Sequence, residues 1–277
     1  TLPIPIPFTA EGGFTKKVAI LPFQVQSGYV DPRSGRILQQ TAIDRLQAEC
    51  PSVRFQESSD PEFPISVSEI PRLEDGSFDN FELAMVGRRW GLNALMISTL
   101  SSVSVDEQEE GFWWFKKLQY YVQVEVRVEL LDSETASKLL SHTVNRRVEI
   151  DRFDVDMINA RNQVELYYFE ETLDDIAEEI AEAVCRTMEE QSWKSYVLLV
   201  EGGELLIAAG AEAELQTGVL LEIFDSSEVV QAAGARRYIL PGPKIGEARV
   251  TVVDARVSRA AVVSGSEFRP GQVVRAR

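Results

Sequence analysis

The chain has few of the residues on which many catalytic mechanisms depend. Its 277 residues include one histidine and two cysteines. A single histidine excludes a His-rich metal site and most mechanisms that use an imidazole base. The sequence also lacks a phosphate-binding Gly-x4-Gly-Lys, a Gly-x-Ser-x-Gly nucleophile elbow and a dinucleotide fingerprint after a strand. We therefore predict a protein that is not an enzyme, with no catalytic residue, no metal site and no cofactor.

Basic residues are also scarce. The chain has 28 Lys and Arg against 44 Asp and Glu, a formal net charge of −16 at pH 7. Residues 194–277 contain ten of each sign, so residues 1–193 carry the whole excess. Because phosphate backbones need clustered positive charge, we exclude nucleic acid as the main partner. Solubility is the favoured explanation of the acidity, and a basic surface or a divalent cation is the alternative.

Long apolar runs are absent, since none approaches the roughly 20 residues of a membrane-spanning helix. The sequence begins at Thr1 without a methionine and continues Leu-Pro-Ile-Pro-Ile-Pro, which predicts an extended leader over residues 1–15. We expect an exported chain whose signal has been removed, with peripheral or lipid-anchored membrane association as an option. No lipid-bearing cysteine is present in this leader.

The two cysteines, Cys50 and Cys185, both fall in the first part of the chain. A disulfide between them would close a long loop and contribute roughly 4–5 kcal/mol in the chain-entropy description. Two unpaired buried thiols are the preferred interpretation, because sequence gives no Cα separation.

Residues 16–192 alternate strand and helix patterns. The expected elements, in the order β-α-β-α-β-β-β-α, are strand 16–23, helix 37–49, strand 53–57, helix 81–90, strand 95–105, strands 119–131 and 138–150 joined by a turn, and helix 169–190. The order predicts an α+β or α/β domain whose mixed sheet combines parallel and antiparallel strands with flanking helices.

Residues 193–277 instead show short apolar runs separated by glycine turns such as Gly202-Gly203 and Pro270-Gly271. The strands expected here are 196–200, 204–207, 219–224, 244–253, 260–263 and 273–275. This spacing predicts a small all-β, SH3-like barrel of five or six strands. The chain is thus expected to divide into 1–15, 16–192 and 193–277.

Three segments of the first domain resemble TolB-N-like and CsgG-like envelope proteins. Val18-Ala19-Ile20-Leu21-Pro22-Phe23 is similar to their "VAVLPF" opening strand, and the stretch 87–96 is similar to their "REWGADALL" helix and strand. The hairpin 130–140 is similar to "LYDAETGEIL", although Ala136 stands where the family has glycine, which implies a different turn type.

The last third resembles the C-terminal module of flagellar assembly protein T (FlgT). The matching positions are Gly203, Leu206, Gly210, 218–224, 244–250, Val253, 260–265 and 271–274. Both resemblances together, in this order, imply a periplasmic or outer-membrane-associated building block. Such a protein would assemble with protein partners of a flagellar basal-body ring or a related envelope complex.

The strongest local signal is the aromatic run Phe112, Trp113, Trp114 and Phe115, which lies between acidic residues 106–110 and Lys116-Lys117. Strand alternation could bury only half of these side chains, so the others must meet another domain, a partner or a lipid headgroup layer. Cover by another part of this chain and an interface are equally favoured. The hypothesis is a protein contact within an assembly.

Other candidate sites are better explained without a function. His142 is expected to be an ordinary sheet histidine, and the two arginine pairs 146–147 and 236–237 to be salt-bridged surface residues. Carboxylates at four-residue spacing on one helix are expected to form a solvated face rather than a docking face: Glu170, Asp174, Glu178 and Glu182. The alternative function is a soluble ligand-binding or sensor module with a cleft between its domains.

Overall fold

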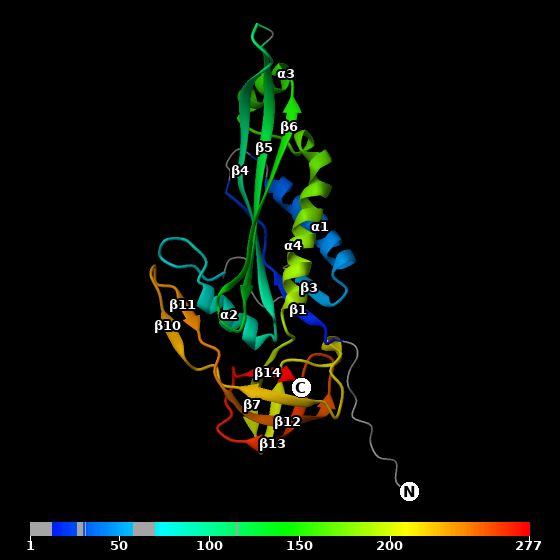
Figure 1. Ribbon diagram of the computed structural model, residues 1–277, viewed down its shortest axis with the longest axis vertical. Coiled ribbons are helices and arrows are strands. Elements are labelled where there is room, and N and C mark those ends of the chain that lie inside the picture. Colours follow the sequence, from blue (N-terminus) through cyan, green and yellow to red (C-terminus); the bar gives the residue numbers. More distant parts are fainter. Residues whose placement is uncertain (1–12, 27–29, 31, 58–69, 115) are drawn as a thin grey trace.

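The computed structural model describes residues 13–26, 30, 32–57, 70–114 and 116–277, so most of the expected leader lies outside the described residues. The expected fold class is confirmed: a mixed sheet with flanking helices is followed by a small closed barrel. Figure 1 shows an elongated molecule with the barrel at one end and the tip of a long hairpin at the other.

The sheet combines parallel and antiparallel strands, as expected. Its spatial order is β3-β1-β4-β5-β6, with β2 beside β4. The first three pairings, of β1 with β3 and β4 and of β2 with β4, are parallel, and β4, β5 and β6 follow one another antiparallel. The strands are β1 (Lys16–Ile20), β2 (Gln24–Val25), β3 (Val53–Glu57), β4 (Ala94–Glu110), β5 (Lys117–Asp132) and β6 (Lys138–Ile150).

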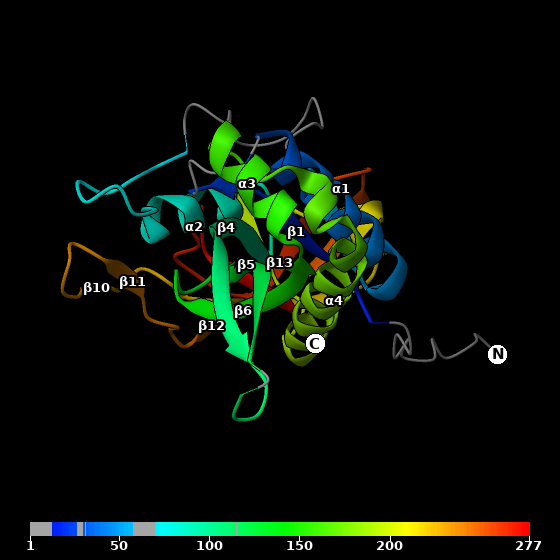
Figure 2. The same cartoon turned by 90° about the horizontal axis from the view of Figure 1, so that it is seen from above.

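Helices cover both faces of this sheet. Figure 2, seen along the long axis, shows α1 (Pro32–Glu49) and α4 (Leu173–Glu190) on one side and α2 (Asn80–Arg89) on the other. The apolar face predicted for the last helix is buried, from Leu173 to Met188. Two short 3-10 turns, Leu166–Tyr168 and Glu170–Thr172, precede α4, so the regular helix starts later than expected.

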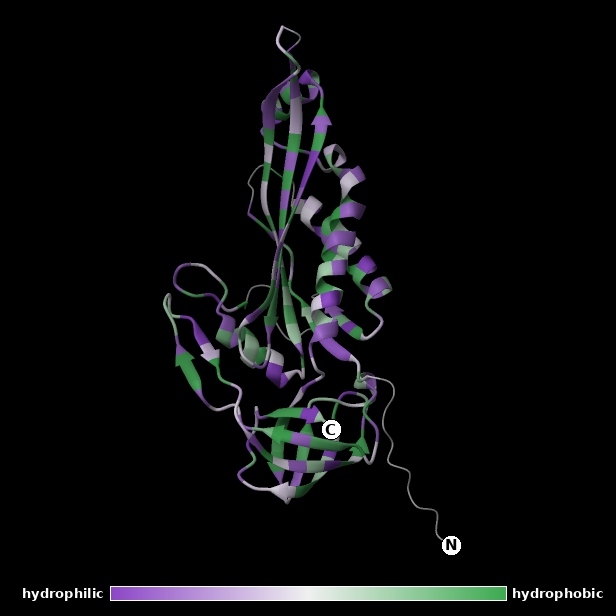
Figure 3. Ribbon diagram, in the orientation of Figure 1, coloured by the Kyte–Doolittle hydropathy of each residue, from purple (hydrophilic) through white to green (hydrophobic). Residues whose placement is uncertain are grey.

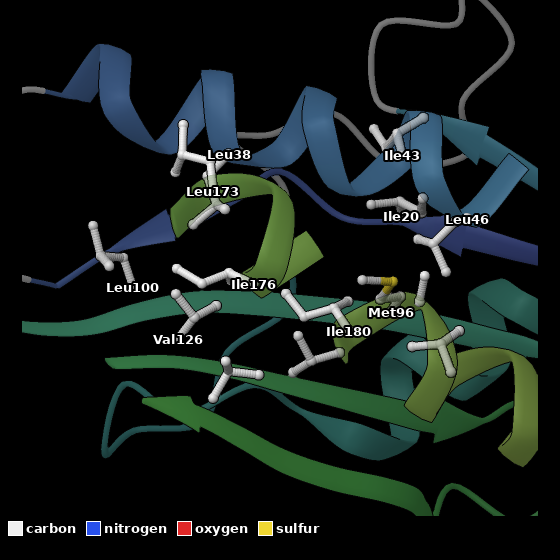
Figure 4. Packing of buried hydrophobic residues seen from close by; sticks show 14 of the residues in the cluster. Ile20, Leu38, Ile43, Leu46, Met96, Leu100, Val126, Leu173, Ile176 and Ile180 are labelled. Carbon is white, nitrogen blue, oxygen red and sulfur yellow. The ribbon is translucent and has the colours of Figure 1, made fainter. Parts of the chain in front are cut away.

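Alternation along the central strands separates two cores. Met96 and Leu100 of β4 belong to the core that faces α1 and α4, where Figure 4 shows Met96 near Leu46 and Ile180 and Leu100 near Leu173. Leu95 and Ile97 point to the opposite face, where they pack with residues of α2. Successive residues face opposite sides of the sheet up to the bulge between Leu100 and Ser102, after which Val103 joins the same core as Leu100.

A disulfide bond also joins the end of α1 to α4. Cys50, after the end of α1, forms a disulfide with Cys185 of α4, with a Cα–Cα distance of 5.4 Å. The interpretation of two unpaired thiols is therefore wrong. The packing of α1 beside α4, with the two helices running in the same direction, brings together two residues 135 positions apart in the sequence.

Six strands form the closed barrel in the order β12-β13-β8-β7-β14-β9. They are β7 (Ser195–Glu201), β8 (Glu204–Ile207), β9 (Leu220–Phe224), β12 (Lys244–Val253), β13 (Ser258–Gly265) and β14 (Val273–Ala276). Figure 3 shows hydrophobic and hydrophilic residues alternating along these strands. The inward residues, among them Leu205, Ile207 and Ile223, form a core of their own. A 3-10 turn, Ala211–Ala213, follows β8.

Three elements were not predicted. The short strand β2 pairs with β4 beyond β1, and α3 (Arg152–Arg161) begins with a capping box between Asp151 and Asp154. Only Ile158 of α3 is buried, so the helix has no apolar stripe to detect. The third element is a separate hairpin of β10 (Val229–Gln231) and β11 (Arg237–Ile239), which Figure 1 shows beside α2.

Candidate interaction surface

The candidate surface lies at the end of the β4–β5 hairpin. β4 runs seventeen residues from the centre of the sheet, and its whole length pairs with β5 up to Glu110 and Lys117. The strand next to β5, β6, stops earlier: its last residue, Ile150, pairs with Tyr120 of β5. The hairpin therefore extends beyond the sheet by three residue pairs and the connecting loop, which Figure 1 shows as the extreme end of the long axis.

Three residues of the aromatic run, Phe112, Trp113 and Trp114, lie in that loop rather than in a strand. Phe112, Trp113 and Trp114 are 86%, 71% and 74% exposed, and Phe115 lies outside the described residues. The expectation that alternation would bury half of the run is wrong for these three residues, because a turn has no buried face. The two indoles stack on each other with ring centroids 4.5 Å apart, so their main neighbour among the described residues is each other.

Backbone geometry at the tip is unusual for such large residues. Gly111 has a φ of 128°, and Trp113 has a φ of 59°. A positive φ is uncommon for any residue with a side chain and is an outlier for a bulky one. The loop therefore holds Trp113 in a left-handed conformation with its indole in solvent.

The base of the loop is polar and internally paired. Lys116 donates to Glu109 at 2.7 Å, and the Tyr121 hydroxyl donates to Glu110 at 2.7 Å. The hydrogen bond from Lys116 lowers the pKa of the Glu109 carboxyl, and the same bond raises the pKa of Lys116. The Arg147 guanidinium lies 3.4 Å from the centroid of the Tyr121 ring. These contacts fix the strands below the loop, while Phe112, Trp113 and Trp114 stay exposed.

A second polar cluster, here called the joint, connects the sheet to the barrel. It comprises Arg88, Asp132, Glu134, Lys194 and Arg275. Lys194 donates to Asp132 and, at 3.1 Å, to Glu134, and Arg275 donates to Glu134 at 2.7 Å. The turn that joins β5 to β6 thus supplies two carboxylates, and the barrel supplies two cations.

Arg88 completes the joint from α2. Its guanidinium donates to the carbonyl oxygens of Ser133, Glu134 and Gly271 and to the Ser226 hydroxyl. Burial lowers the pKa of Arg88, yet an arginine with such contacts remains charged. These contacts satisfy the guanidinium within the chain and bind both units, so Arg88 is a structural residue.

Sequence reasoning missed the joint. The sequence pattern predicts only a turn between residues 131 and 138, which contains Asp132 and Glu134, and only a change in charge balance at Lys194. Two acidic residues in a predicted turn gave no signal of burial. The nearest hint was that the excess of acidic residues ends at residue 193, because the basic residues of the neutral segment that follows can pair with the acidic unit before it.

A pocket of about 220 Å³ lies beside the joint, between α2 and the barrel. Its lining includes Phe81, Met85, Arg88, Asp225 and Arg269. Ligand sites commonly measure about 300–1,000 Å³, so this pocket is small. Arg88 is also fully engaged by protein groups, which leaves few unused donors for a ligand.

The other residues considered from sequence are paired or exposed. His142 hydrogen-bonds with Glu179 at 2.9 Å, and Arg146 donates to the same carboxylate at 2.8 Å. Arg237 pairs with Asp79 and Glu82, as expected for a salt-bridged residue. The four carboxylates considered from sequence are all exposed, Glu170 in the 3-10 turn before α4 and Asp174, Glu178 and Glu182 on α4.

Within the described ranges, no three His, Cys, Asp or Glu side chains gather closely enough to hold a metal ion. No helix in the described part of the chain is both long and apolar enough to span a membrane.

No family model matches the chain, and no curated protein matches it either. The resemblance to flagellar assembly protein T therefore gains no family match. Solved structures with a similar arrangement include lipoprotein GNA1162 of Neisseria meningitidis, at 14% identity over 53% of this chain and 94% of that one, with a TM-score of 0.34.

Two further solved structures have comparable scores. A minor lipoprotein of Acinetobacter baumannii is 11% identical over 62% of this chain and 94% of its own, with a TM-score of 0.33. The PelC dodecamer of Paraburkholderia phytofirmans is 15% identical over 65% and 91%, with a TM-score of 0.34.

Proposed function

We propose that this chain is a non-enzymatic structural or interaction protein of the bacterial cell envelope, and that the tip of the β4–β5 hairpin is its contact surface. The observation that carries the proposal is the exposure of Phe112, Trp113 and Trp114 at the far end of the molecule. Aromatic side chains dominate interface energetics, and clustered exposed apolar residues mark interaction sites.

The disulfide supports the proposed location in the cell envelope. Cys50 and Cys185 are both buried and bonded to each other. Disulfides persist in the periplasm and at cell surfaces and are rare in the cytosol. An exported protein of the periplasm or the outer membrane fits this pairing.

The build of the molecule supports a structural role. The joint ties the barrel to the α/β unit through two buried ion pairs of Lys194 and a partly exposed one of Arg275, so the two units can present the hairpin tip from a fixed support. A rigid support suits a component of an assembly, because it limits the conformational entropy lost on binding. Membership of a flagellar basal-body ring is the narrower form of the proposal and rests on the sequence resemblance.

The alternative, a ligand-binding or sensor module with an interdomain cleft, has weaker support. The pocket at the joint is small, and its arginine is committed to protein groups. We therefore favour a function carried by the tip.

Co-sedimentation with purified envelope fractions tests the proposal. The full chain should be recovered with the envelope, and Trp113→Ser with Trp114→Ser should abolish most of that recovery. Leu199→Ser is the matched control, because it removes an exposed apolar side chain on the barrel at the opposite end. Equal recovery of all three proteins, or recovery of none, would contradict the proposal.

A further inference from the structure

The shape of the tip restricts what it can contact. Phe112, Trp113 and Trp114 sit on a narrow loop at the end of two strands, and all three are largely exposed. A convex loop of this kind buries its side chains only by entering a matching pocket or a deformable medium. The lipid interface is such a medium, and tryptophan is enriched there because its ring is apolar and its N–H is polar.

The reach of the hairpin fits insertion to a shallow depth. Beyond the last pair of β5 with β6, three residue pairs continue the β4–β5 ladder. At about 3.4 Å per residue, these three pairs carry the loop about 10 Å beyond the end of β6. Interfacial segments bury their apolar side chains about 5–10 Å into the boundary between headgroups and acyl chains. The loop can therefore enter that layer before the body of the sheet meets it.

The charge near the tip indicates the kind of lipid. Residues 106–110 contain four carboxylates, and the loop returns with two lysines, so the hairpin end is net acidic. Lys116 is already paired with Glu109. Polybasic segments are attracted to anionic lipids, and an acidic segment is repelled by them. A zwitterionic surface carries no such penalty.

The contacts at the base also prepare the loop for this role. Glu109 and Glu110 each accept a hydrogen bond from a neighbour in the hairpin, at 2.7 Å in both cases. A carboxylate held in this way costs less to bring near a headgroup layer than an unpaired one. The aromatic residues stand beyond these pairs and make the first contact with the surface.

We propose that Phe112, Trp113 and Trp114 insert into the headgroup–acyl boundary of a zwitterionic lipid surface and dock the protein there reversibly. This inference rests on the proposed function and names the partner of the same surface. One shallow insertion gives weak and reversible association, since stable anchoring needs a second signal.

Flotation of the full chain with protein-free vesicles tests the inference. Vesicles of phosphatidylethanolamine and phosphatidylcholine should bind the chain. Trp113→Ser with Trp114→Ser should lower the bound fraction by at least about tenfold, given the area that two indoles bury. Leu199→Ser should bind like the unchanged chain, and circular dichroism should show that both variants are folded.

Lipid composition gives an independent readout. Phosphatidylglycerol added to the vesicles should weaken binding at low salt, and added salt should restore it by screening the repulsion. Stronger binding to anionic vesicles, or loss of binding on Lys116→Gln with Lys117→Gln alone, would overturn the proposed zwitterionic insertion.

The two proposals fail in different ways. If envelope recovery depends on the tryptophans but protein-free vesicles do not bind, the tip contacts a protein, and the lipid inference is wrong while the proposed function stands. If neither envelope nor vesicles bind, both are wrong. Quenching of tryptophan fluorescence by brominated lipid, present in the unchanged chain and absent from the double variant, supports insertion directly.

Discussion

Lys194, the residue before the first barrel strand, donates a hydrogen bond to Glu134 of the sheet's β5–β6 turn at 3.1 Å, with both side chains only 6% exposed. Arg275 of the last barrel strand donates to the other carboxylate oxygen of the same residue at 2.7 Å. Glu134 therefore forms ion pairs with side chains from both ends of the barrel segment. The contact between the α/β unit and the barrel therefore depends in part on this one side chain.

We expect Glu134→Ala to lower the free energy of unfolding by about 1.5–3 kcal/mol, because it removes the carboxylate that pairs with Arg275 and one of the two carboxylates that pair with the buried Lys194. The midpoint of urea denaturation measures this change. Lys138→Ala is the matched control, since its ion pair with Glu129 is exposed and should cost less than about 1 kcal/mol. Similar losses in both variants would show that the joint contributes no more than a surface pair.

The sequence predicted elements with a clear period and missed contacts that depend on assembly. The alternation of Val122, Val124, Val126 and Val128 identified β5 because every second residue enters the core. The helix 152–161 has no such period, because only Ile158 reaches the core. Periodicity reports burial, so an element packed by few side chains gives no signal.

The candidate surface could be located from sequence, but its arrangement could not. The run 112–115 was noticeable by composition alone. The position of residues 112–114 in a loop depends on where the β4–β5 pairing ends, at Glu110 and Lys117, and their distance beyond the sheet depends on where β6 ends, at the pairing of Ile150 with Tyr120. The joint was not predicted, and the disulfide was considered but not preferred, for the same reason: both bring together residues far apart in the chain, such as Cys50 and Cys185.

We expect loss of the disulfide to destabilise the chain by about 4–5 kcal/mol, because the unfolded ensemble gains the entropy of a loop of 135 residues. Urea denaturation of the unchanged chain with and without reductant measures the effect. Cys50→Ser with Cys185→Ser should match the reduced chain and should not respond to reductant. A double variant as stable as the oxidised chain would contradict the expectation.

The cluster of Glu179, Arg146 and His142 predicts a pH dependence. Burial opposes ionisation of Glu179, but the hydrogen bonds from Arg146 and His142 outweigh it and hold the pKa of the carboxyl below its ordinary 4.5. A carboxyl with a depressed folded-state pKa contributes stability above its unfolded pKa and loses it as pH falls through the folded value. The stability difference between the unchanged chain and Glu179→Gln should therefore be constant near neutral pH.

That difference should shrink below about pH 4.5 and vanish at still lower pH. Because the site is partly exposed, we expect it to stay under about 1 kcal/mol at neutral pH. Denaturation midpoints of both proteins across this range provide the measurement. A difference that grows on acidification would show that the carboxyl is not stabilised by its neighbours.

The two stacked tryptophans allow stability and surface binding to be separated. Trp113 adopts a φ of 59° while 71% exposed, and Trp114 is not among the residues with positive φ. Glycine adopts the left-handed region without steric cost, so Trp113→Gly should raise the free energy of unfolding by about 0.5–1 kcal/mol. Trp114→Gly removes an equally exposed indole without relieving strain and should be neutral or destabilising by a similar amount.

Both single variants should bind envelope fractions less well than the unchanged chain, since each loses one exposed indole of the tip. Thermal denaturation and co-sedimentation on the same two proteins make the comparison. A variant that is more stable and binds less well is expected where a strained residue is retained for contact rather than for folding. If Trp113→Gly were both less stable and fully competent to bind, the left-handed indole would belong to the folding of the hairpin, and the tip would lose its place as the contact surface.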